Sequence, residues 1–169
     1  MKIINAGVTA PKGFKCAGLR AGVKSGKTNK DMAMIVSEVP AKIAGTFTKN
    51  IVKAAPVLWG KKIVEEQEAV RAVVINTGIA NACTGAQGYE NVVTEAKEVA
   101  KLLDIKPEEV VVGSTGVIGQ QLPMDVIKEG IKKLVPELKA DRQSEEDASW
   151  AILTTDTKPK EAAVEVEIN

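Results

Sequence analysis

The order of apolar runs and amphipathic segments in the middle of the chain is the feature that most limits its fold. Short apolar runs at 70–75 and 110–112 predict buried strands. A helix is predicted between them, over about 90–104, from apolar residues at i, i+4, i+7 and i+11: Val92, Ala96, Val99 and Leu103. A second helix is predicted over 123–136, where proline occupies a favoured first-turn position and also marks the end. This strand–helix–strand–helix order predicts the α/β class.

Shorter elements are expected on either side of this unit. The first thirty residues are rich in glycine and lysine and predict loops with short strands at most. Apolar runs at 32–36 and 43–48 predict two strands with a turn between them. A short third helix is predicted from Ser144, because residues 144–147 resemble a capping box. A length of 169 residues is typical of one domain, so we predict a single domain over 1–169.

The C-terminal segment 163–168 alternates apolar and charged residues, which is typical of a half-buried strand. The alternation predicts that Val164, Val166 and Ile168 face a core. One interpretation is an edge strand paired with an earlier part of the chain. We favour another, in which the sequence stops in the middle of a hairpin, because Asn169 is a residue common at the first position of a hairpin turn.

Composition excludes several classes of function. A net charge of +1 and only five aromatic residues argue against a nucleic-acid partner or an anionic membrane surface. The chain has no histidine, which excludes a histidine general base and a histidine-containing zinc site of its own, and we expect neither metal nor cofactor. Two cysteines do not make a disulfide scaffold. With no targeting segment or membrane-length apolar run, we expect a reducing, cytoplasmic location.

A glycine- and lysine-rich loop at 22–28 looks like a phosphate-binding loop, but its spacing is one residue short. The required first glycine would stand at position 21, which is Ala21. The preceding residues 15–20 also make a poor buried strand. We therefore favour a flexible basic loop, and we keep a nucleotide-binding module that uses Lys24 to Thr28 as an alternative function.

Three further segments carry groups suited to chemistry. Residues 76–88 interleave small polar residues with glycine, and their Cys83 is expected to be a buried side chain rather than a nucleophile, since no histidine activates it. The strand at 110–112 opens into a Gly-Ser-Thr-Gly turn at 113–116, whose N–H groups and hydroxyls are able to stabilise an oxyanion. Residues 154–160 combine hydroxyl, carboxylate and ammonium groups able to bind a zwitterionic substrate, although a capped, solvated turn is the simpler interpretation.

Taken together, four segments resemble the bifunctional ornithine acetyltransferase (glutamate N-acetyltransferase) family of arginine biosynthesis. They match in order and spacing, and the opening residues 7–14 fit as well. The segments are AGTFTKNIVKAAPV at 44–57, NTGIANACTGAQG at 76–88, GSTGVIGQQLPM at 113–124 and AILTTDTKPK at 151–160.

The resemblance implies an enzyme with a self-cleaving precursor. Family members cleave themselves before a threonine, which becomes the N-terminal nucleophile of a β chain. This threonine takes acetyl from N-acetylornithine and passes it to glutamate in a ping-pong cycle, and some members also accept acetyl-CoA. The implied fold is a layered α/β sandwich similar to the N-terminal-nucleophile hydrolases, and the implied assembly is an α₂β₂ heterotetramer.

Carried over residue by residue, the resemblance assigns Thr115 and Gly116 to the oxyanion hole. It places a substrate-contacting threonine at Thr154 or Thr155, of which we favour Thr154. A substrate-contacting lysine and the Ala-Thr cleavage junction would follow Asn169, so the 169 residues are expected to be an incomplete α chain without its own nucleophile. An N-terminal-nucleophile aminopeptidase of related fold is the alternative enzyme.

Overall fold

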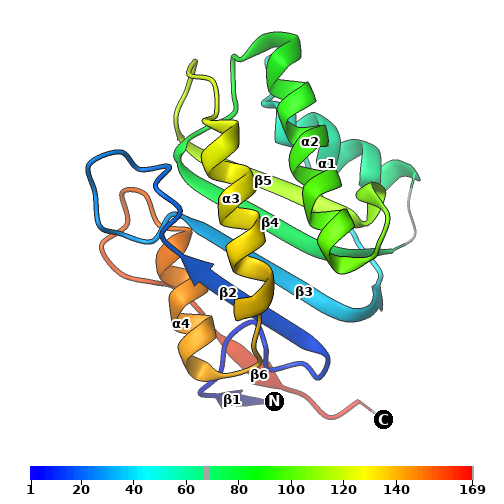
Figure 1. Ribbon diagram of the computed structural model, residues 1–169. Coiled ribbons are helices and arrows are strands. Elements are labelled where there is room, and N and C mark those ends of the chain that lie inside the picture. The colour runs from blue at the N-terminus through cyan, green and yellow to red at the C-terminus, as the bar shows by residue number, and fades with distance from the viewer. Residues whose placement is uncertain (67–68, 169) are drawn as a thin grey trace.

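A four-stranded mixed sheet forms the centre of the computed structural model, which describes residues 1–66 and 69–168 (Figure 1). The strand order is β2-β3-β4-β5, antiparallel except for the parallel pair β4 and β5. The bounds of these strands are Phe14–Leu19 (β2), Met32–Ala41 (β3), Val70–Ile79 (β4) and Val110–Val117 (β5). A two-stranded ribbon of β1 (Lys2–Ile4) and β6 (Ala163–Glu165) completes the β-structure of the described residues.

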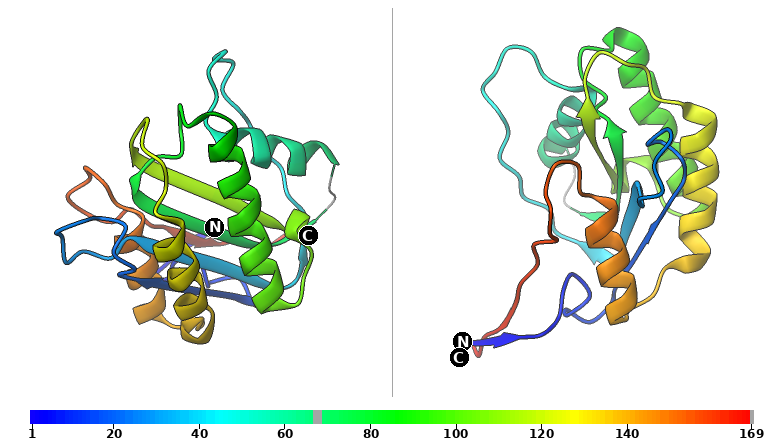
Figure 2. Two further views of the ribbon diagram at one scale, coloured as in Figure 1. Left: turned by 45° about the horizontal axis from the view of Figure 1, so that its top comes forward. Right: turned by 90° about the vertical axis from the view of Figure 1, so that its left-hand side faces the viewer.

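Helices cover the two faces of the sheet unequally (Figure 2). The helices are α1 (Ala55–Glu66), α2 (Gly85–Leu103), α3 (Met124–Leu134) and α4 (Arg142–Ala151), with short 3₁₀ turns at Pro107–Glu109 and Val135–Glu137. Apolar residues of α1, α2 and α3 share one core cluster with the sheet, whereas α4 packs on the opposite face. Because strand side chains alternate between faces, Met34 joins the large core and Ala33 packs against α4.

The two helices predicted from periodicity are confirmed. Val92, Ala96 and Val99 are fully buried, and Leu103 packs against the same core. The second helix begins one residue after Pro123 and passes into a 3₁₀ turn around Pro136. The first begins at Gly85, about five residues earlier than predicted.

Two predictions about the remaining elements are wrong, and the predicted third helix forms but begins two residues earlier. Residues 43–48 form no strand, and the segment just after them is held by side chains: Thr48 Oγ1 accepts from the Asn50 N–H, and Asn50 Oδ1 accepts from the Val52 N–H. The segment 15–20, judged a poor strand, lies mostly within β2. Helix α4 begins at Arg142 rather than Ser144, because Asp141 is the N-cap and its carboxylate accepts the Ser144 N–H at 2.8 Å.

The C-terminal strand has a partner within the chain, which contradicts the favoured mid-hairpin interpretation. Strand β6 pairs antiparallel with β1, with Val164 opposite Ile3. The expected burial is also wrong: Val164, Val166 and Ile168 are 53%, 52% and 87% exposed, because a two-stranded ribbon has no layer stacked on it. The expected turn residue Asn169 lies outside the described residues. Across residues 1–66 and 69–168, none of the helices has the length and apolar character needed to cross a lipid bilayer.

Candidate active site

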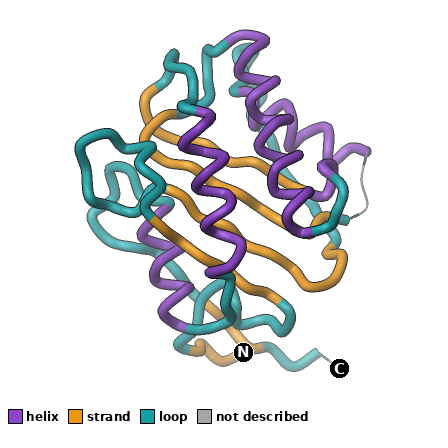
Figure 3. Tube along the Cα trace, viewed as in Figure 1, coloured by secondary structure: helices purple, strands orange, loops and turns teal. Residues whose placement is uncertain are grey.

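The loops that follow β2, β4, β5 and α4 gather at one end of the sheet (Figure 3). There they enclose a cavity of about 540 Å³ at the carboxyl ends of the parallel strands β4 and β5. Ligands of open α/β sheets commonly bind at this place. The cavity is lined by Val23, Lys24, Ser25, Lys27, Gly78, Ile79, Gly116, Val117, Gln120, Thr154 and Thr155.

This cavity unites three of the four site residues predicted from the sequence. Gly116 comes from the end of β5, and Thr154 and Thr155 come from the turn after α4. Thr115 precedes Gly116 in β5 and is exposed, but it does not line the cavity. The structure therefore brings together segments that are about forty residues apart in the sequence.

The Gly-Ser-Thr-Gly segment is the continuation of strand β5 and not the predicted turn. Thr115 lies opposite Thr77 and Gly116 opposite Gly78 in the parallel register. The Ser114 hydroxyl donates to the Ile79 carbonyl at 2.9 Å and so holds the end of β4. Thr115, in contrast, is exposed.

Glycine is required at both positions where the strands approach most closely. Gly116 has φ +136°, and a Cβ there would lie 2.3 Å from the carbonyl carbon of Gly78. Gly78 has φ +108°, and a Cβ there would lie 2.8 Å from Cγ of Lys24. Both φ values belong to the region that favours glycine. The floor of the cavity is therefore made of backbone packed against backbone.

The basic loop at 22–28 begins against this floor, and its first residues are held by hydrogen bonds. The buried carboxylate of Asp31 accepts the backbone N–H groups of Ala21, Gly22 and Lys24 at 2.6, 3.1 and 2.9 Å. Strand β3, and not a helix, follows the loop. The strand–loop–helix context that a nucleotide-binding loop needs is absent at this point of the described chain.

Two hydrogen bonds fix the turn that carries Thr154 and Thr155. Oγ1 of the buried Thr77 donates to the Ala151 carbonyl at 2.8 Å, and Nζ of Lys24 donates to the Leu153 carbonyl at 2.7 Å. Both threonine side chains are exposed toward the cavity. Asp156 does not line this cavity, and its carboxylate pairs with the Lys160 ammonium.

Positive charge dominates the cavity. Lys24 and Lys27 line it, and its lining includes no acidic residue. Burial lowers the pKa of the Lys24 ammonium; the nearby Asp31 carboxylate opposes this shift and Lys27 adds to it. A ligand that carries a carboxylate would fit these charges. No group of three or more cysteine and acidic side chains in residues 1–66 and 69–168 is placed to hold a metal ion.

The segment 76–88 connects β4 to α2 and is held by its own polar side chains. Thr84 Oγ1 donates to Asn81 Oδ1 at 2.6 Å, and Asn81 Nδ2 donates to the Gly88 carbonyl at 2.8 Å. The predicted burial of Cys83 is wrong: its thiol is exposed, because the backbone turns there with φ 57° to start the helix. Cys83 does not line the cavity.

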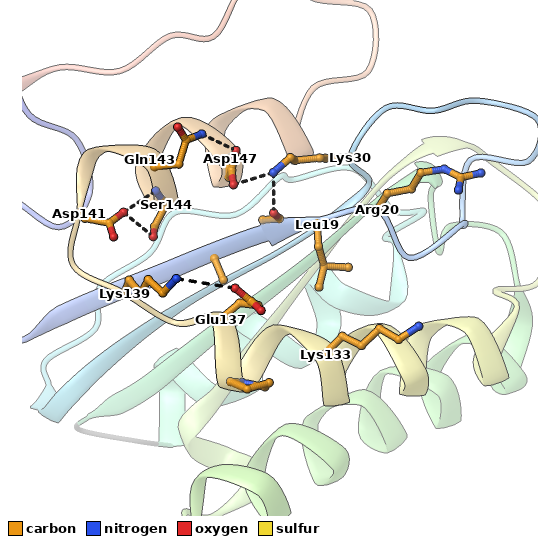
Figure 4. A pocket seen from close by; sticks show the side chains of 13 residues that line it. Leu19, Arg20, Lys30, Lys133, Glu137, Lys139, Asp141, Gln143, Ser144 and Asp147 are labelled. Carbon is orange, nitrogen blue, oxygen red and sulfur yellow. Dashed lines mark hydrogen bonds and ion pairs between the residues drawn. The ribbon is translucent and has the colours of Figure 1, made fainter.

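A second cavity of about 530 Å³ lies between β2, the end of α3 and the start of α4 (Figure 4). Its charged side chains largely satisfy one another. Lys30 pairs with Asp147 at 2.6 Å, Lys139 lies 3.9 Å from Glu137, and Asp141 caps α4. None of the site residues predicted from the sequence lines this cavity. The cavity at the ends of β4 and β5 is therefore the stronger candidate for an active site.

Comparison with known proteins agrees with the family resemblance. Residues 15–169 match the ArgJ family. The chain is 48% identical over 164 residues to an arginine biosynthesis bifunctional protein ArgJ of Streptococcus mutans, covering 97% of this chain and 40% of that protein. It is 44% identical to a chloroplastic ArgJ of Citrullus lanatus, covering 99% of this chain and 36% of that protein. The chain thus spans two fifths or less of the length of these relatives.

Two solved structures share the fold. A crystal structure of ArgJ from Bacillus halodurans superposes with a TM-score of 0.87 at 40% identity, over 92% of this chain and 80% of that one. The ornithine acetyltransferase of Mycobacterium tuberculosis, solved in complex with ornithine, superposes with a TM-score of 0.91 at 40% identity, over 95% of this chain and 86% of that one. These likenesses confirm the predicted α/β fold. The chain belongs to the ArgJ family.

Proposed function

We propose that this chain forms the α-chain part of a glutamate N-acetyltransferase. The enzyme takes acetyl from N-acetylornithine and passes it to glutamate through an acyl-enzyme in a ping-pong cycle. The observation that carries the proposal is the single cavity that joins Gly116 at a strand end to Thr154 and Thr155 on a separate turn. The names of the relatives and the ornithine bound in the Mycobacterium tuberculosis structure support the same substrate class.

In this proposal Thr115 and Gly116 hold the oxyanion of the tetrahedral intermediate. Acyl transfer places negative charge on the carbonyl oxygen, and donors that are already oriented stabilise that charge without reorganisation. The close packing of Gly116 on Gly78 supports this role, because it fixes the backbone of the oxyanion site. Thr154, or alternatively Thr155, contacts the substrate from the opposite wall. The positive charge of the cavity suits the carboxylates of glutamate and of N-acetylornithine.

The nucleophile comes from outside these 169 residues. The chain has no histidine to activate a hydroxyl or a thiol in the cavity. Following the family resemblance, we assign the nucleophile to the N-terminal threonine of a β chain that is released from the same precursor. Residues 1–169 then serve as one domain of an α₂β₂ assembly in the cytoplasm, without a cofactor.

The uncovered part of the sheet supports such a partner. Helix α4 covers its face of the sheet over β2 and β3. On the same face the side chain of Val73 is only half-buried, and Thr115 is exposed. A β chain that packs over β4 and β5 would bury this surface and bring its N-terminus beside Thr115.

The test is acetyl transfer by the complete enzyme. Glutamate acetylation is measured with N-acetylornithine and, separately, with acetyl-CoA as donor, and peptide hydrolysis and ATP binding are measured on the same preparation. The proposal expects transfer from N-acetylornithine and accumulation of an acetyl-enzyme when glutamate is omitted. Peptide hydrolysis without acetyl transfer would favour the aminopeptidase alternative over the proposed function. Tight ATP binding without acetyl transfer would favour the nucleotide-binding module.

A further inference from the structure

Lys24 connects two loops of the candidate active site that are far apart in the sequence. Its ammonium donates to the carbonyl of Lys30 at 3.2 Å and to the carbonyl of Leu153, 129 residues away, at 2.7 Å. Leu153 directly precedes Thr154 and Thr155. The Lys24 side chain therefore makes a direct hydrogen bond between the basic loop and the turn that carries Thr154 and Thr155.

The backbone of Lys24 is itself firmly placed. Asp31 accepts its N–H at 2.9 Å, and the Lys24 backbone and side chain lie against Gly78, where no Cβ would fit. The ammonium thus extends from a fixed point on the floor of the cavity toward the turn. Thr77 binds the Ala151 carbonyl, two residues before Leu153. Lys24 therefore holds the part of the turn that directly precedes the two threonines.

We propose that Lys24 is a positioning residue for acetyl transfer, which holds the Leu153 carbonyl so that Thr154 and Thr155 face Gly116 across the cavity. This inference rests on the proposed function, because it deepens the role of the same site. It gives the glycine- and lysine-rich loop a purpose that does not involve nucleotide binding. The step it controls is substrate binding, since Lys24 acts on the turn and not on the strand end that holds the oxyanion.

The chemistry of the contact requires a lysine-like donor. An ammonium has three N–H donors, and two of them reach carbonyls that belong to different loops. Bonds from a charged donor are stronger than neutral ones, and the more so where water is partly excluded, as burial at Lys24 implies. A methionine side chain has similar length but no donor. It would leave the Leu153 carbonyl without this partner and free the turn.

The experiment compares Lys24→Met with Lys12→Met in the complete enzyme. Lys12 is exposed in the loop before β2, so its replacement removes the same charge away from the cavity. We expect Lys24→Met to raise the KM for N-acetylornithine about 10-fold or more while kcat changes less than about 3-fold, and Lys12→Met to change neither. Hydrogen exchange of the Ile152 and Leu153 amides is measured on both variants, and we expect it to accelerate only in Lys24→Met.

The outcomes separate this inference from the proposed function. A lower kcat with an unchanged KM in Lys24→Met would overturn the positioning role, because a loss of folded enzyme gives the same result. Unchanged hydrogen exchange of the amides of residues 152–153 would also overturn it. If the unsubstituted enzyme transfers no acetyl, the proposed function fails, whereas hydrogen exchange still decides whether Lys24 holds the turn. Thermal unfolding checks that the variant is folded; if it is not, Lys24→Leu, which also lacks a donor, is measured in its place with the same expected results.

Discussion

Replacing Glu95 with methionine is expected to stabilise the protein, and to do so more at pH 7 than at pH 5. Glu95 lies on the core side of α2, is fully buried, and neither of its carboxylate oxygens has a hydrogen-bond partner. Burial raises the pKa of this carboxyl from 4.5 to about 8. The folded protein therefore keeps the proton at neutral pH, while the unfolded chain releases it.

The magnitude follows from the linkage between proton binding and folding. For an acid whose pKa is raised by folding, the free energy of unfolding is greatest below pH 4.5 and falls until the pH passes about 8. One pKa unit corresponds to about 1.4 kcal/mol, so the carboxyl costs ~3 kcal/mol at pH 7 and under ~1 kcal/mol at pH 5. Methionine has a similar length and no titratable group, so the substitution removes this free-energy cost.

Urea unfolding at several pH values measures the effect. The difference in the free energy of unfolding between Glu95→Met and the unsubstituted protein should grow by about 2 kcal/mol or more from pH 5 to pH 7. Glu90→Met is the control, since Glu90 lies on the same helix and is exposed. A difference that stays constant with pH, or that matches the control, would refute the argument that Glu95 is neutral in the folded state.

Three further predictions concern the site. Thr115→Ala should lower kcat by about 10²–10³ with little change in KM, as expected for the loss of one oxyanion donor, and steady-state kinetics that show only a raised KM would reassign Thr115 to substrate binding. Gly116→Ala should unfold at a lower temperature than Gly119→Ala, because both positions have positive φ but only the Cβ at 116 would meet backbone, at 2.3 Å; equal melting temperatures would contradict the close packing. The purified 169-residue chain alone should acetylate no glutamate, and turnover above background would place the nucleophile within it.

The elements that the sequence predicted well are those with local causes. Helix α2 was predictable because Val92, Ala96 and Val99 repeat at helical spacing and all three are buried. Helix α1 was not predicted. Its buried side carries Trp59 and Ile63, four residues apart, and this spacing is the local signal that indicates the helix. The pairing of β6 with β1 joins the two ends of the chain, and no local pattern specifies such a partner.

The site was predicted in parts but not as an arrangement. Gly116, Thr154 and Thr155 were assigned through the family resemblance, and in the structure their two segments line one cavity. The role of the basic loop was missed, because its order depends on the buried Asp31 and on a carbonyl contact to Leu153. The one local signal was an acidic residue shortly after a lysine-rich, glycine-rich loop, which is too common to identify a site.

The two walls of the cavity are held by different kinds of interaction, and this difference separates chemistry from binding. The strand wall rests mainly on close contacts between the backbones of Gly78 and Gly116, so substitutions there should act on kcat or on folding. The opposite wall is a turn held by hydrogen bonds from the side chains of Thr77 and Lys24. Substitutions on that wall should therefore appear in KM. In the proposed function, the groups that stabilise charge in the transition state would then lie on the wall held by backbone contacts, and the groups that bind substrate on the wall held by side chains.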